Sequence, residues 1–392
     1  MVNYDLLLLV VFYLFLLVIF RIYRNKFEVQ WKIFALYKTK IGLKLMDSIA
    51  KKVPSLLYVS GYFGIFIGFL GMIFTFGFVV WAAYRLIFVP AADAVLAPVL
   101  PGISISEQLP VLSFWHWIIA ILIVATVHEF SHGVYARLRN IKIKSSGFAF
   151  LGPILAAFVE PDEKELKKKR IRDQLLVFSA GPFSNIVLGI LIFLIMVFVF
   201  IPLQTNMIEI NGVIIGSINS TLPIGQSGLA AGHVIQNIDG RDVDDANVIV
   251  NVLKNKKPGD KVNIVANESS FNVVLAEHPE DKTRGFLGIS FSGYDSILKN
   301  ESLSWLYSIL KWFNMLLFWT FNISIGVGLF NLLPLGPVDG GRMFHAAMLK
   351  ITKNERKALK LLSLVSMIVL FLIIVNLMPF IIRFLKWILS PF

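Results

Sequence analysis

Long apolar segments constrain the fold of this chain more than any other feature. Six stretches stay apolar over about 20 residues or more, and a helix of that length crosses the hydrocarbon core of a bilayer. Of the 392 residues, 56% are hydrophobic and only 16% are charged, a balance typical of integral membrane proteins. We therefore expect a polytopic α-helical membrane protein with about six transmembrane helices. The predicted spans are residues 4–22, 56–88, 113–136, 174–201, 304–333 and 358–389.

The charges of the connecting segments predict how the chain is oriented. Residues 21–54 carry nine Lys and Arg, residues 137–173 carry ten and residues 340–360 carry six, whereas residues 90–112 carry none. Basic loops stay on the cytoplasmic side of a membrane, so we expect both termini on the opposite side. This bias explains the net charge of +12 without a nucleic-acid partner. The expected location is the plasma membrane of a prokaryote.

Residues 203–302 differ in kind from the rest of the chain. They hold 8 basic and 12 acidic residues, short β-type runs, and turn signals such as Asp239-Gly240 and Pro258-Gly259. An insertion of this length is enough for a small folded domain. We expect a soluble α+β domain between the fourth and fifth spans, on the extracytoplasmic side.

The third predicted span contains the sequence His128-Glu129-Phe130-Ser131-His132. Residues four apart on a helix are offset by about 40° in rotation and about 6 Å in rise, so both imidazoles can reach one metal ion. Glu129 can then take a proton from a metal-bound water, which is the arrangement of zinc hydrolases. The alternative is a buried structural cluster without metal. Ionisable groups at membrane depth are costly, and this favours a functional site.

A catalytic zinc site needs a third protein ligand, and the chain has no cysteine to provide it. Asp339 is a candidate because it lies near the cytoplasmic end of the fifth span, at the same predicted depth as the two histidines. On its own, an Asp among Pro and Gly residues would be interpreted as a helix cap. Together with the histidine pair, it is better interpreted as a metal ligand.

Residues 141–158 follow the third span directly and are too short and too rich in Gly and Pro to form a pair of helices. Irregular backbone at membrane depth has to be buried in protein or to line a wet cavity. We expect a re-entrant β-hairpin beside the metal site. A plain surface loop is the alternative.

Five glycines in the second span predict close packing against other helices, because small residues let helix backbones approach. A functional hinge is the alternative. The glycines are Gly61, Gly64, Gly68, Gly71 and Gly77.

Three motifs on three separate spans resemble those of the site-2 protease family of intramembrane zinc metalloproteases. The family's His-Glu-x-x-His matches residues 128–132, and its Gly-Pro-x-x-Asn matches residues 181–185. Its Asn-x-x-Pro-x-x-Pro-x-Asp-Gly matches residues 331–340, with Val338 in place of the usual Leu. The resemblance covers about residues 111–345.

The resemblance implies a site for one zinc ion, Zn2+, held by His128, His132 and Asp339. It implies that Glu129 is the catalytic base that activates the water. It also implies that Asn185 and Asn331 line the cleft near the substrate. Hydrogen bonding between helices is the alternative for both asparagines.

The inserted domain resembles a PDZ domain. Residues 227–240 match the pattern A-G-L-x-x-G-D-x-I-x-x-I-x-G, with His233 in place of the common Asp. A later segment resembles the PDZ carboxylate-binding loop. It comes after the other strands, as in the circularly permuted prokaryotic type of PDZ domain. Its backbone N–H groups could capture a C-terminus, or the domain could act as a size filter or spacer. The loop consists of Gly285, Phe286, Leu287 and Gly288.

From this resemblance we expect a zinc-dependent metalloendopeptidase that cleaves the transmembrane segments of single-span membrane proteins, in regulated intramembrane proteolysis. Another protease would trim the substrates first, and the PDZ domain would select them. Competing hypotheses are a catalytically silent PDZ-bearing membrane adaptor, a zinc transporter and a metallopeptidase that cuts soluble tails.

The predicted domains alternate between membrane and soluble parts. The protease core is split into two segments by the PDZ-like domain and is flanked by additional spans at both ends. The predicted boundaries are 1–110 for the N-terminal spans and basic loop, 111–202 and 303–350 for the core, 203–302 for the PDZ-like domain, and 351–392 for the last span.

Overall fold

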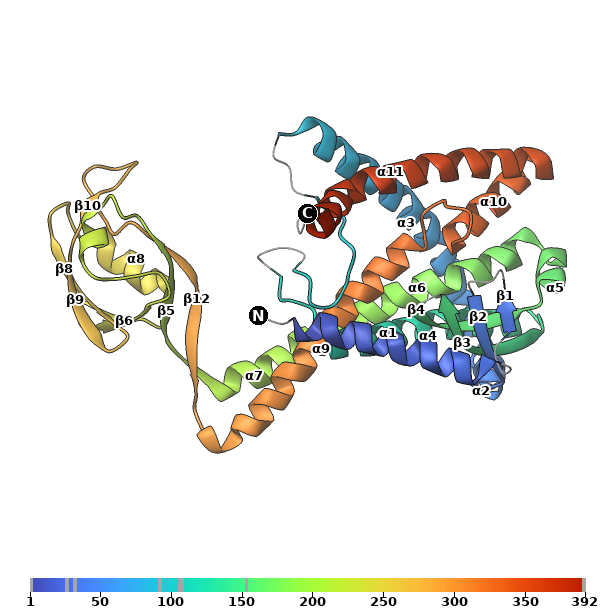
Figure 1. The fold of residues 1–392 in the computed structure, drawn as a ribbon, viewed down its shortest axis with the longest axis horizontal. Helices are drawn as coiled ribbons and strands as arrows, with labels where there is room; N and C mark the ends of the chain where they lie inside the picture. The colour runs from blue at the N-terminus through green and yellow to red at the C-terminus, as the bar shows by residue number, and fades with distance from the viewer. Residues whose placement is uncertain are drawn as a thin grey trace. The chain divides into compact units, whose positions relative to one another are not determined.

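The computed structural model describes residues 3–24, 28–30, 34–90, 94–104, 109–151 and 154–389. The chain divides into two compact units (Figure 1). The first consists of Met1–Met196 and Asn314–Phe392, and the second of Val197–Phe313. The candidate metal ligands all belong to the first unit.

Six helices within the described residues are long and apolar enough to cross a membrane. Many of their large apolar side chains are exposed, above all along the first, second and last of them, as expected for surfaces that face lipid. The predicted polytopic helical architecture is confirmed. The helices are α1 (Tyr4–Ile22), α3 (Pro54–Phe88), α4 (Phe114–Leu138), α6 (Ile171–Ile195), α9 (Ser304–Phe330) and α11 (Glu355–Leu389).

Helix α3 packs its glycines against the elements that carry the predicted site motifs. A Cβ atom on Gly61 would lie 2.6 Å from side-chain atoms of both Tyr135 and Leu176, and one on Gly68 would lie 2.6 Å from Met343. A Cβ atom on Gly64 would lie 3.1 Å from Phe183 and one on Gly71 would lie 2.4 Å from Leu332, whereas no described atom lies within 4 Å of a Cβ on Gly77. The predicted packing role is therefore confirmed for four of the five glycines.

A four-stranded antiparallel sheet lies beside α4, with the strands in the order β1-β2-β3-β4 (Figure 1). The predicted hairpin is present as β3 and β4; its residues 152 and 153 lie outside the described residues. The sequence did not predict the other two strands, because residues 21–54 were interpreted only as a basic loop. The strands are β1 (Glu28–Gln30), β2 (Phe34–Thr39), β3 (Ile143–Leu151) and β4 (Ile154–Pro161).

Strand β4 is the edge of this sheet that is relevant to the site. It pairs with β3 in continuous register from Ser146↔Val159 to Leu151↔Ile154. Among the described residues, no strand pairs with its other side. Three short helices complete the first unit: α2 (Leu43–Lys52), α5 (Glu163–Lys168) and α10 (Asp339–Thr352).

Charged side chains connect the strands of this sheet. The Lys38 ammonium lies 2.7 Å from a carboxylate oxygen of Glu28 in β1 and 3.2 Å from one of Glu160 in β4. The hydrogen bond with Glu28, aided by Glu160, raises the pKa of Lys38 above its ordinary value, although its partial burial acts in the opposite direction. Lys38 therefore stays charged at neutral pH.

The second unit contains an α+β domain, as predicted. Its main sheet has the order β12-β5-β6-β8-β9, with the short β7 paired to β6, and β10 pairs separately with β11. Alternate residues of β8 are buried, which is the pattern of a strand with one face on a core. The elements are α7 (Ile201–Met207), β5 (Ile208–Ile218), β6 (Val234–Ile238), β7 (Arg241–Asp242), α8 (Ala246–Lys254), β8 (Lys261–Ala266), β9 (Ser269–Val274), β10 (Ala276–Glu277), β11 (Gly285–Phe286) and β12 (Ile289–Leu298).

Candidate active site

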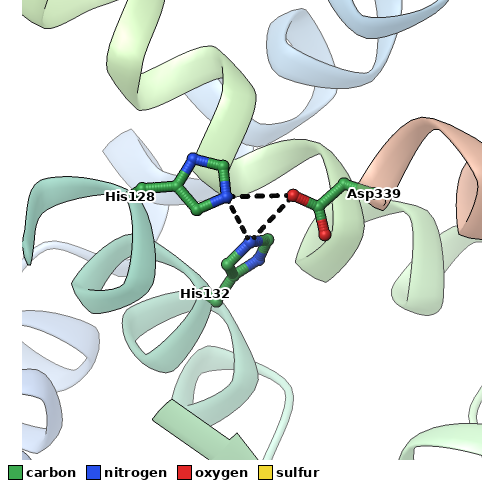
Figure 2. Close-up of side chains that lie close together, drawn as sticks. All are labelled: His128, His132 and Asp339. Carbon is green, nitrogen blue, oxygen red and sulfur yellow. Dashed lines mark hydrogen bonds and ion pairs between the residues drawn. The ribbon is translucent and has the colours of Figure 1, made fainter. Parts of the chain in front are cut away.

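Helix α4 and the start of α10 bring three potential metal ligands together (Figure 2). Nε2 of His128 lies 3.0 Å from Oδ2 of Asp339, and Nε2 of His132 lies 3.2 Å from the same oxygen. The two Nε2 atoms are 3.2 Å apart. All three side chains are buried. Asp339 lies 211 residues after His128 and 207 residues after His132 in the chain, yet the three ligand atoms form one compact triangle.

The far ring nitrogen of each histidine is held by a group on α6. Nδ1 of His132 lies 2.7 Å from the carbonyl oxygen of Val177, so it carries the proton and donates it. Nδ1 of His128 lies 2.9 Å from Nδ2 of Asn185. The two ends of an amide are interchangeable in such a network, so Oδ1 of Asn185 can face this nitrogen instead and accept its proton. In this tautomer both Nε2 atoms are free to bind a metal.

Asp339 is placed by the tight loop that connects α9 to α10. The N–H of Gly340 donates to the carbonyl oxygen of Asn331 at 2.6 Å and closes the loop. A Cβ atom on Gly340 would lie 2.3 Å from the carbonyl oxygen of Leu332, and one on Gly341 would lie 2.1 Å from that of Leu335. Only glycine permits this approach of backbone to backbone. The loop therefore fixes where Asp339 emerges at the first turn of α10.

Gly181 provides space beside the triangle. A Cβ atom at this position in α6 would lie 2.4 Å from Nε2 of His132 and 2.6 Å from Nε2 of His128. A side chain here would fill the volume where these two nitrogens converge. The sequence pattern alone could not reveal this role, because it depends on how α6 packs against α4.

The three residues fit a zinc ion. Ligands about 2.0–2.1 Å from a tetrahedral zinc lie about 3.3 Å from one another, close to the observed separations of 3.0–3.2 Å. Two unprotonated imidazole nitrogens this close repel each other unless a cation lies between them. Two nitrogen donors and one carboxylate oxygen are a ligand set typical of catalytic zinc, which retains one open position.

A cleft of about 630 Å³ opens at the ligand triangle. It is lined by His128, His132 and Asp339, by Glu129, and by residues of β4. Oε2 of Glu129 accepts a hydrogen bond of 3.0 Å from the backbone N–H of Val159. The cleft thus joins the ligands, the Glu129 carboxylate and the edge of the sheet in one space.

The two predicted asparagines lie in different surroundings. Asn331 lines the cleft and donates to the carbonyl oxygen of Val327 in the last turn of α9. Asn185 is fully buried, at 0% exposure, and contacts His128. Substrate contact stays a prediction for both asparagines, and for Asn185 the surroundings favour support of His128.

The predicted carboxylate-binding loop of the second unit borders a groove of about 160 Å³. Residues 285–288 line it together with Ile249 and Leu253 of α8 and Phe291 of β12. An apolar groove between a helix and an edge strand has the form of a peptide-binding site. Peptide binding there stays a prediction.

Comparisons with known proteins agree with the motifs. The model of peptidase family M50 matches residues 116–375. Uncharacterized protein MJ0971 of Methanocaldococcus jannaschii is 31% identical over 244 residues, 61% of this chain and 59% of that protein. Zinc metalloprotease RasP of Shouchella clausii is 24% identical over 236 residues, 49% of this chain and 54% of that protein. The chain thus covers about half to three fifths of these relatives.

Among solved structures, the PDZ domain of the SdrC-like protein from Listeria monocytogenes is 26% identical, covering 21% of this chain and 87% of that chain, with a TM-score of 0.19. The family assignment rests on the first comparison, which extends over more than half of the chain and includes all three predicted metal ligands. The chain belongs to peptidase family M50, the site-2 protease family.

Proposed function

We propose that this protein is a zinc-dependent intramembrane endopeptidase that cleaves the transmembrane segment of a membrane-held substrate. One observation carries the proposal. The ligand triangle of His128, His132 and Asp339 opens on the same cleft as Glu129. Two of the ligands and Glu129 belong to a helix long and apolar enough to lie within a bilayer.

When bound, a zinc ion supplies Lewis acidity, polarising the scissile carbonyl and making a water nucleophilic near neutral pH. Glu129 accepts the proton of the attacking water and passes it to the leaving amine. Asn185 and the Val177 carbonyl hold the two imidazoles in the ligand tautomer throughout. A single ion is sufficient for this chemistry.

The proposed substrates are single-span membrane proteins. The carbonyl groups of a transmembrane helix are hydrogen-bonded within the helix, so the segment has to unwind before attack. The edge of β4 that pairs with no described strand borders the cleft and can hold an unwound segment as an added strand. Strand β4 is therefore proposed as the surface that receives the extended substrate.

The basic loops support an orientation in which the cleft lies on the cytoplasmic side of the membrane. The PDZ-like domain and both termini are then extracytoplasmic. In this position the domain could examine the part of a substrate that another protease has already trimmed, and so select which proteins reach the cleft. The proposed location remains the plasma membrane of a prokaryote.

Cleavage by purified protein in liposomes tests the proposal. The assay compares the wild type with Glu129→Gln, and with wild type treated first with chelator and then with added zinc. We expect cleavage of a single-span reporter that is lost in the variant, lost with chelator and restored by zinc. Glu129→Gln should retain zinc, and His132→Ala should lose it. An inactive wild type without bound metal would support the silent PDZ-bearing adaptor instead.

A further inference from the structure

The hydrogen bond between Glu129 and Val159 has no place in the zinc chemistry described above. Oε2 of Glu129 accepts from the backbone N–H of Val159 at 3.0 Å. Glu129 belongs to α4 and Val159 to β4, 30 residues later in the chain. This bond connects the proposed base directly to the edge of the sheet that borders the cleft.

The direction of this N–H follows from the register of the hairpin. Because the pairing with β3 is continuous from Ile154 to Val159, residues two apart in β4 present their N–H groups to the same edge. The N–H of Val159 points to Glu129 and away from β3, so the N–H of Ala157 also points away from β3. Pro161, two residues further, has no N–H to give. Val159 is thus the last backbone donor on this edge.

The hydrogen bond therefore fixes Oε2 of Glu129 and leaves Oε1 to accept a proton. A Glu side chain has three rotatable bonds, and without a partner it would sample several rotamers. A hydrogen bond to a charged carboxylate is stronger than one between neutral groups. Held through Oε2, Glu129 keeps Oε1 available in the cleft that it lines with His128 and Asp339.

We propose that the backbone N–H of Val159 positions Glu129 for proton transfer, so that the strand proposed to hold the substrate also orients the base. This inference rests on the proposed function, in which Glu129 is the base. It makes Val159 a positioning residue whose contribution comes from its backbone and not from its side chain.

Replacement of a single backbone N–H tests the proposal. Incorporation of the α-hydroxy analogue of valine at position 159 turns this N–H into an ester oxygen and keeps the side chain. We expect kcat to fall about tenfold or more, with KM and zinc content unchanged. The comparison variant is the α-hydroxy analogue of alanine at position 157, which removes a donor that the same edge offers to the substrate, and it should raise KM rather than lower kcat.

Unchanged kcat in the 159 ester, or equal losses in both esters, would overturn the positioning role. A rise in KM without a fall in kcat would also overturn it, since the N–H would then serve the substrate alone. Failure of the proposed function is distinguishable, because the unmodified protein would then leave the reporter uncut.

A second readout needs no activity and no metal. In chelator-treated full-length protein, Glu129→Ala should accelerate hydrogen exchange of the Val159 amide and leave the Ala157 amide unchanged. Glu129→Gln should preserve the protection, because its amide oxygen can also accept the bond. Equal exchange at Val159 in the wild type and in Glu129→Ala would contradict the proposal.

Discussion

At the scale of single residues, Gly181 determines how closely α6 approaches the proposed ligands. The added Cβ in Gly181→Ala would lie within 2.4–2.6 Å of both Nε2 atoms and would displace an ion between them. We expect zinc affinity to fall about tenfold or more, while the helix persists because Ala favours helices more than Gly. Competition with a chelator measures this.

A matched control for this variant is Gly326→Ala in α9. No described atom lies within 4 Å of a Cβ at this position, so zinc affinity should remain that of the wild type. Wild-type affinity in Gly181→Ala as well would mean that the metal lies elsewhere than between the two Nε2 atoms.

Residue patterns predicted the ligand triangle but not what surrounds it. The helical period alone places His128 and His132 side by side, and the later motif provides Asp339. The partners of the imidazoles were not evident, since Val177 acts through its carbonyl oxygen and Asn185 was predicted as a substrate contact. A backbone group leaves no signature in the sequence, because every residue has one.

At the scale of single elements, α3 packs through its glycine face onto the helices and loop of the site. Gly71→Leu would insert a side chain where Leu332 is fully buried. We expect a loss of about 1–3 kcal/mol in the free energy of unfolding, measured as a lower thermal midpoint in detergent. Gly77→Leu, on a part of α3 with no described neighbour, should melt like the wild type; equal losses in both variants would contradict the packing.

Asp239 gives the inserted domain a defined response to acid. Burial alone would raise the pKa of Asp239, but hydrogen bonds from Lys256 at 2.7 Å and from the Asn263 N–H at 2.8 Å outweigh it, so the pKa is lowered. A carboxylate with a lowered folded-state pKa stabilises the fold above its unfolded-state pKa, and this contribution is lost as the pH falls through the folded-state value.

The prediction is that Asp239→Asn destabilises the domain at about pH 5 but much less at about pH 2.5. Urea midpoints of the domain within the full-length protein, read by pepsin cleavage, measure the difference. If Asp239→Asn lowers the urea midpoint equally at both pH values, the ionised carboxylate contributes nothing to the stability of the domain.

Element prediction succeeded for the spans and failed for the first two strands. Spans were predicted to within a few residues at most ends because apolar length is a local property. Strands β1 and β2 were missed because they are short and because β2 pairs with β3 about a hundred residues later, from Phe34↔Leu151 to Thr39↔Ser146. The Lys and Arg residues of 21–54 predict a basic loop, but they give no signal of this long-range pairing.

At the scale of the whole molecule, the inserted domain and the site belong to different compact units. Deletion of residues 207–290 should therefore leave the ligand triangle intact. If the domain selects trimmed substrates, the deletion variant should cut untrimmed reporters that the wild type spares, as measured by product yield in liposomes. The same deletion combined with Glu129→Gln is the control, and unchanged substrate choice would count against the selecting role.

The central claim is hydrolysis of a peptide bond inside a membrane span. The most direct measurement is the mass of the two products formed from a single-span reporter by the zinc-loaded protein in liposomes. We expect a cut between residues of the apolar span that is absent in Glu129→Gln. A cut confined to the soluble flanks of the reporter would contradict it, because the enzyme would then be a metallopeptidase that trims exposed tails.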